Sequence, residues 1–137
     1  WISMFLDNSG KDLRLELMPL IKIHYCHKIN PSDIESLSSS LVSHVASTLD
    51  KSEDFVMVIF QQTNFQSFGY NSIKPSIYTE FKNVGDLSPE ITHCLSSLIT
   101  ELFVKTIKLD PTRLYIEFQS AERHRWGWNG KTFYIPE

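Results

Sequence analysis

A strand–helix–strand pattern occurs twice in this chain, and it limits the fold more than any other feature of the sequence. The expected elements, in chain order, are a strand at 20–26, a helix at 32–49, a strand at 55–60, a strand at 76–81, a helix at 88–107 and a strand at 114–118. One constant offset relates the apolar residues of the two helices, which are Ile34, Leu37 and Leu41 in the first and Ile91, Cys94 and Leu98 in the second. This repetition indicates an internal duplication.

Two such units predict an α+β domain. Each strand–helix–strand unit is expected to be a right-handed βαβ crossover. Side by side, the duplicated units give a four-stranded mixed sheet with both helices on one face. The other face also needs a cover, and apolar groups for it are expected from Phe60, Tyr78, Phe81 and Phe118. We therefore expect neighbouring subunits to associate through their sheets.

Short sequence motifs indicate where the two helices begin. Ser32-x-x-Glu35 after Pro31 matches a capping box, and Ser88-Pro89-Glu90 provides an N-cap, a proline at the first helical position and an acid in the first turn. The near-continuous apolar run Phe55–Phe60 is typical of a strand covered on both faces.

The C-terminal part predicts a hairpin. Asn129-Gly130 stands between two aromatic pairs, which is a strong signal for a tight turn between two strands. Because so small a ribbon is not stable alone, it is expected to dock on a sheet edge.

Composition excludes several classes of function. The 137 residues suit one domain, and the net charge of −3 gives no general attraction to nucleic acid or to an anionic membrane. Cys26 and Cys94 form no C-x-x-C, and His24 and His27 have no further ligand at a suitable spacing, so no metal and no cofactor are expected. No apolar run reaches the length of a membrane span, and no secretory signal is recognisable. A cytoplasmic location is predicted, with secretion without a signal peptide as the alternative.

Residues 1–18 are interpreted as an appendage to a domain that covers 19–137. They include Leu13, Leu15 and Leu17, whose alternation is compatible with a short added strand. The chain begins with Trp1, and Met18 directly precedes Pro19, so a start at Met18 would leave Pro19 as the N-terminal residue. An N-terminal proline is a basic secondary amine, whereas a proline inside a chain is an amide without basicity.

Several motifs together resemble the macrophage migration inhibitory factor branch of the tautomerase superfamily. They are Met18-Pro19-Leu20-Ile21, Lys51 after the first helix, Phe68-Gly69, Val84-Gly85, Pro111-x-Arg113-x-Tyr115-Ile116 and Trp126-Gly127-Trp128-Asn129-Gly130-x-Thr132-Phe133. The resemblance implies a homotrimer with active sites between subunits and an N-terminal proline as catalytic base. By position, Pro19 is the expected base and Lys51 the cation of the pocket. The implied substrate-binding residues are Val84 through its backbone, Tyr115 and Glu117 on the fourth strand, and Trp126, Trp128 and Phe133 as an aromatic wall.

Three departures from the family pattern are visible. Glu117 stands where the family usually has Asn, Gly69-Tyr70-Asn71 replaces Gly-Gly-Ser, and Ser76-Ile77-Tyr78 stands at the family's C-x-x-C. No thiol–disulfide activity is therefore expected. A carboxylate at Glu117 would raise the pKa of the amine and repel an anionic substrate.

The expected function is keto–enol tautomerisation of a phenylpyruvate or dopachrome type, on a small aromatic or keto-acid substrate. A base whose pKa lies near neutrality can remove and return the proton, and burial together with Lys51 would lower the pKa of the Pro19 amine. The alternative is a cytokine-like or protein-interaction trimer with a vestigial or blocked site, whose protein receptor the sequence does not name. RNA-binding domains share the βαββαβ order, but the negative net charge argues against binding to nucleic acid.

Overall fold

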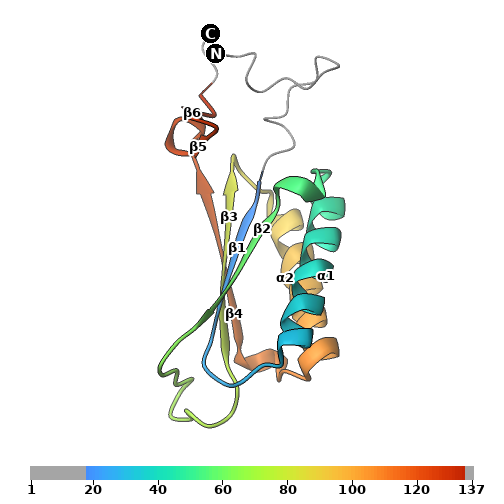
Figure 1. Cartoon of the computed structure of the whole chain (residues 1–137), viewed down its shortest axis with the longest axis vertical. Helices are drawn as coiled ribbons and strands as arrows, with labels where there is room; N and C mark the ends of the chain where they lie inside the picture. The colour runs from blue at the N-terminus through green and yellow to red at the C-terminus, as the bar shows by residue number, and fades with distance from the viewer. Residues whose placement is uncertain (1–17, 135–137) are drawn as a thin grey trace.

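The computed structural model describes residues 18–134, and both predicted strand–helix–strand units are present in it (Figure 1). The main elements are β1 (Leu20–Tyr25), α1 (Pro31–Leu49), β2 (Met57–Gln62), β3 (Ile77–Val84), α2 (Pro89–Ile107) and β4 (Leu114–Ala121). Three 3₁₀ turns are η3 (Glu53–Phe55), η4 (Pro111–Arg113) and η5 (Arg123–Arg125), and the small strands β5 (Gly127–Trp128) and β6 (Lys131–Thr132) follow. The alternating strand predicted within 1–18 lies outside the described residues, except for Met18.

The four long strands form one mixed sheet in the order β2-β1-β3-β4. The strands of each unit are parallel, β1 to β2 and β3 to β4, and the two units meet where β1 and β3 pair antiparallel. Both helices lie side by side on one face of the sheet (Figure 1). The predicted α+β fold with a duplicated βαβ unit is confirmed.

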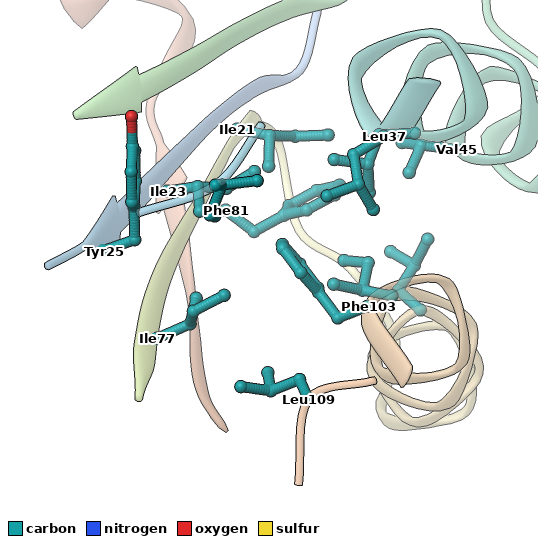
Figure 2. Packing of buried hydrophobic residues seen from close by; sticks show 13 residues of the cluster. Ile21, Ile23, Tyr25, Leu37, Val45, Ile77, Phe81, Phe103 and Leu109 are labelled. Atoms are coloured by element: carbon teal, nitrogen blue, oxygen red, sulfur yellow. The ribbon is translucent and has the colours of Figure 1, made fainter. Parts of the chain in front are cut away.

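The core fills the space between the sheet and the helices (Figure 2). Alternate residues of β1 and β3 point toward the helices, because successive side chains of a strand lie on opposite faces. Fully buried members of this core are Ile21, Ile23, Leu37, Leu41, Val45, Phe81, Leu95, Ile99 and Phe103.

The face of the sheet away from the helices is polar, which corrects one prediction. Phe60, Phe81 and Phe118 belong to the helix-side core, and the Phe81 and Phe118 rings pack with centroids 5.2 Å apart. Of the four predicted cover residues only Tyr78 lies on the other face, since it is separated from Phe81 by an odd number of positions. There, His24 Nε2 lies 2.6 Å from Glu80 Oε2.

Helix α1 begins two residues earlier than its capping box predicts. Its N-cap is Asn30, whose side chain makes no cap hydrogen bond, and Pro31 occupies the first turn. The prediction of Ser32 as the cap was wrong, because the fixed φ of Pro31 already suits the first helical position. In α2 the predicted cap is confirmed, since Ser88 Oγ accepts a hydrogen bond from the Ile91 N–H at 3.2 Å.

These two serines make a matched pair for a stability measurement. Replacing Ser88 by Ala is expected to lower the free energy of unfolding by about 1 kcal/mol, because the Ile91 N–H loses its acceptor. Replacing Ser32 by Ala is expected to change it by less than about 0.5 kcal/mol. Urea denaturation of both variants measures the difference, and equal effects would contradict the capping assignment.

Strand β2 starts later than predicted and lies at the edge of the sheet. Phe55 belongs to the turn η3, and the first strand residue, Met57, is 59% exposed. The apolar run is therefore not covered on both faces within this subunit. The prediction was wrong because a short apolar run does not show whether one face or both faces of a strand are covered.

The predicted hairpin is confirmed, although it does not join a sheet edge. Asn129 and Gly130 both have positive φ, 54° and 78°, as a two-residue turn of this kind requires. Strands β5 and β6 form a separate two-stranded sheet. Within its own subunit the hairpin is held by side-chain packing rather than by strand pairing, so it does not dock on the edge of its own sheet.

Arg113 organises the connection between β2 and β3. Its guanidinium donates hydrogen bonds to the backbone carbonyls of Phe68, Asn71, Lys74 and Pro75, at distances from 2.9 to 3.3 Å. The guanidinium carbon also lies 5.3 Å from the centroid of the Phe68 ring. Although it is charged, Arg113 is only 8% exposed. The loop is thus anchored by one buried side chain from the start of the β4 segment.

Candidate active site

A cleft of about 490 Å³ opens where β1 begins. Pro19 lies in it directly before the first strand residue, and the Pro19 carbonyl accepts a hydrogen bond from the Met57 N–H at 3.0 Å. This hydrogen bond fixes the position of Pro19 beside the start of β2. The cleft is lined by Met18, Pro19, Leu20, Asp54, Phe55, Val56, Met57, Trp126, Gly127, Trp128 and Phe133.

Aromatic side chains form much of the wall. The hairpin turn folds the chain back so that Trp128 and Phe133 reach the same cleft, and the Phe133 N–H donates to the Trp126 carbonyl at 3.1 Å. The Trp128 and Phe55 rings meet edge to face, with centroids 6.0 Å apart. Phe133 is only 1% exposed. Such a wall suits a planar or aryl ligand.

Met18 forms part of the wall of this cleft in the full chain. Its side chain is 6% exposed and packs with Phe133 in a small apolar cluster, against which Phe55, Val84, Trp126 and Trp128 also pack. While Met18 is attached, the nitrogen of Pro19 is an amide nitrogen and cannot act as a base. Met18 therefore both blocks the nitrogen and takes up apolar space beside it.

Two other predicted residues do not form part of the cleft lining. Val84 ends β3 and packs against the Met18 and Phe133 cluster, and its carbonyl accepts a hydrogen bond from Asn83 Nδ2 at 3.0 Å. Lys51 follows the left-handed C-cap residue Asp50, and its N–H donates to the Ala46 carbonyl at 2.9 Å. Lys51 is not among the residues that line the cleft.

The structure does not bring Tyr115 and Glu117 to the cleft of their own subunit. They lie on the polar face of the sheet, where Tyr115 is 66% exposed and its ring packs on Phe68 with centroids 4.9 Å apart. The Tyr78 hydroxyl donates to Glu117 Oε1 at 2.5 Å, and Gln119 Nε2 donates to the same oxygen at 2.9 Å. These two hydrogen bonds lower the pKa of the Glu117 carboxyl, and the bond to Glu117 raises the pKa of Tyr78 to about 12.

Comparison with known proteins decides the family. The family model of macrophage migration inhibitory factor (MIF) matches residues 18–134, which is nearly all of the chain. This chain belongs to the MIF family.

Proteins from several organisms are similar to it in sequence or in fold. The macrophage migration inhibitory factor of Xenopus tropicalis is 24% identical over 99 residues, which cover 72% of this chain and 85% of the relative. The crystal structure of a homologue from Prochlorococcus marinus superposes with a TM-score of 0.77 at 32% identity, covering 84% of this chain and 99% of that one. A fused 4-OT protein, described as an asymmetric trimer, shares the fold at 11% identity, with a TM-score of 0.74 and coverage of 84% and 96%.

The segment from Asp54 to Met57 lines the cleft of this MIF-family chain and was not anticipated from its sequence. Phe55 and Asp54 reach it because η3 turns the chain before β2, with Ser52 Oγ accepting from the Asp54 N–H at 3.3 Å. Ser52 before two acidic residues is a recognisable cap signal that would have separated Phe55 from the strand. Met57 also lines the cleft, and its sequence context contains no signal that would have predicted this position.

Neither a metal cluster nor a membrane helix is found in this MIF-family domain. Within residues 18–134 no group of three or more His, Cys, Asp or Glu side chains is arranged to hold a metal ion. Over the same residues no helix has the length and apolar character needed to cross a membrane.

Proposed function

We propose that this MIF-family domain is a cofactor-independent keto–enol tautomerase whose general base is Pro19 once Pro19 is the first residue. The observation that carries the proposal is the position of Pro19 in a cleft walled by Phe55, Trp128 and Phe133. A secondary amine at this position would face a ligand held against aromatic rings. The family membership supports the same reading.

The proposed reaction moves one proton and changes no oxidation state. The Pro19 nitrogen removes the proton from the carbon next to a carbonyl, the electron pair of that C–H bond forms the enol double bond, and the protonated amine then gives the same proton to the carbonyl oxygen. In the reverse direction the amine takes the proton from the enol oxygen and returns it to carbon. A base whose pKa lies near the working pH does both steps efficiently.

Burial at the position of Pro19 would lower the pKa of a free amine there. Pro19 is buried beside Phe133 and Trp128, and burial disfavours the charged form of an amine. Asp54 lines the same cleft and opposes this effect through its negative charge. We assign Lys51 the role of a nearby cation that favours an anionic substrate, and this role does not require Lys51 to line the cleft.

Tyr115 and Glu117 fit a role in a homotrimer. Both lie on the polar face of the sheet and away from the cleft of their own subunit. In the proposed assembly they reach the cleft of the adjacent subunit, as the family resemblance implies. The substrate is then a small aromatic keto acid of the phenylpyruvate or dopachrome type, enclosed by the aromatic wall of one subunit and the fourth strand of the next.

Glu117 sets the expected preference for substrate charge. In a chain that begins at Pro19, replacing Glu117 by Asn is expected to increase kcat/KM for the enol of phenylpyruvate about fivefold, because a carboxylate repels an anionic substrate. Steady-state kinetics on this acidic enol and on its neutral methyl ester measure the effect. Replacing the exposed helix residue Glu101 by Gln is the matched control for loss of one charge, and an equal gain in both variants would contradict the assignment.

A second function is favoured by the full chain itself. Met18 packs in the cleft and leaves the Pro19 nitrogen as an amide, so a form that retains residues 1–18 fits a cytokine-like or protein-interaction trimer with a blocked site. The mass of the protein from its native source separates the two forms. The test of the enzyme is a tautomerase assay on the full chain and on a chain that begins at Pro19, run side by side.

A further inference from the structure

A second cavity, of about 300 Å³, lies at the opposite end of β1 from Pro19. Three segments enclose it, namely the connection from β1 to α1, the loop before β3 and the end of α2, which meet at the end of the domain away from the hairpin (Figure 1). Its lining residues are His27, Lys28, Ile29, Asn30, Asp33, Lys74, Pro75, Ile107, Lys108, Leu109 and Asp110. None of them belongs to the cleft around Pro19.

Positive charge exceeds negative charge around this cavity. Three lysines and two aspartates line it. Asp110 is already satisfied, since it forms an ion pair with Lys74 and accepts hydrogen bonds from Thr112. Within residues 18–134 neither Lys28 nor Lys108 has a carboxylate within 4.0 Å. The two lysines are thus available to a ligand, in a chain whose net charge is −3.

His27 supplies a buried polar atom that lacks a partner. Its Nδ1 is buried and has no hydrogen-bond partner in the described part of the chain, while its ring meets the Tyr25 ring edge to face at 6.3 Å. Because this Nδ1 atom is shielded from solvent, a ligand in the open cavity can contact only the other ring nitrogen, Nε2. Burial also lowers the pKa of His27, so the imidazole is neutral at pH 7 and one of its nitrogens can donate.

The start of α1 adds to the same environment. Asn30 and Asp33 from this helix line the cavity, and the Asn30 side chain does not cap the helix. The positive end of the α1 helix dipole is therefore not neutralised by a capping side chain, although the negative charge of Asp33 in the first turn offsets part of this positive charge. The apolar residues Ile29, Ile107 and Leu109 form the remaining wall.

We propose that this cavity is a binding site for a small oxyanion of the phosphate type, held by Lys28 and Lys108 with His27 as a hydrogen-bond donor. Lysine side chains bind phosphate as point charges, and the cavity is large enough for one phosphate group with a small substituent. The site is independent of the proposed tautomerase, because it shares no residue with the cleft around Pro19.

The test is an NMR titration of the full chain with inorganic phosphate at pH 7, with ionic strength held constant by sodium chloride. The imidazole signals of His27 and the amide signals of Ile29 and Lys108 are expected to shift along one saturating curve. Replacing Lys28 by Gln, or Lys108 by Asn, is expected to weaken binding at least about fivefold through loss of one charge. Asn suits position 108 because Lys108 has the left-handed φ of 55°.

A matched control and a clear negative result complete the experiment. Lys105 lies in the last turn of α2 but does not line the cavity, so replacing it by Gln removes one charge and is expected to leave phosphate affinity unchanged. Shifts that grow linearly without saturation would overturn the proposal. Equal weakening by the Lys105 variant would overturn it as well, since the effect would then be a general response to charge.

Discussion

A chain that begins at Pro19 is expected to ketonise the enol of phenylpyruvate at least about 100-fold faster than the chain that carries residues 1–18. A positioned general base contributes about 10²–10⁴ in rate, and the full chain has only an amide nitrogen at this point. Removal of Met18 also vacates the apolar space beside Phe133. Absorbance of the enol, followed at equal concentrations of both proteins, measures the difference.

A mass measurement and one further protein make this comparison specific. Mass spectrometry must first show that the short protein consists of residues 19–137. A short chain with Pro19 replaced by Gly keeps an N-terminal amine and the open cleft but loses the secondary amine, and it is expected to be at least about tenfold slower than the chain with Pro19. Equal rates for the full chain and the Pro19 chain would rule out Pro19 as the base and favour the protein-interaction function.

Replacing Arg113 by Lys is expected to lower the free energy of unfolding by about 3 kcal/mol. The guanidinium donates to four backbone carbonyls of the loop between β2 and β3 from a buried position. A lysine ammonium group cannot donate in the fork-shaped geometry of a guanidinium. Hydrogen bonds to charged groups contribute about 1.5–3 kcal/mol each. Urea denaturation of the full chain measures the loss.

The same substitution at an exposed arginine is the control. Arg125 lies in η5 near the cleft, and replacing it by Lys is expected to change the free energy of unfolding by less than about 0.5 kcal/mol. Hydrogen exchange of the Phe68 and Asn71 amides, which bond to each other's carbonyls, should rise in the Arg113 variant alone. An Arg113 variant as stable as the Arg125 variant would show that the loop does not depend on this anchor.

The elements themselves could be predicted because their signals are local. Helical spacing of Leu37 and Leu41, the Ser88-Pro89 cap and the Asn129-Gly130 turn each involve a few neighbouring residues, and all three signals correspond to observed structure. The duplication also follows from the sequence, because two copies of one unit repeat the same spacing. The prediction of Ser32 as the N-cap was wrong because two signals for the start of the helix, Pro31 and the capping box at Ser32, are adjacent, and the helix starts at Pro31.

The two faces of the sheet were less well predicted, for a physical reason. The pleat places Tyr78 and Phe81 on opposite sides, and the register between β3 and β4 then decides that Tyr78 lies next to Tyr115, with its hydroxyl reaching Glu117. The positions of the aromatic residues in the sequence reveal neither which face of the sheet each one occupies nor the register between neighbouring strands. The polar network of His24, Glu80, Tyr78 and Glu117 is therefore a product of strand pairing.

By itself, the sequence determined the α+β class, the duplicated unit, the hairpin and the aromatic residues that accompany Pro19. Only the tertiary structure decided which of the predicted site residues share a cleft. It joins Pro19 with Trp126, Trp128 and Phe133, adds Phe55 through η3, and leaves Lys51, Tyr115 and Glu117 outside the lining. It also gathers three distant segments around His27 at the other end of β1. Such juxtapositions depend on long-range packing between elements, which no short stretch of sequence encodes.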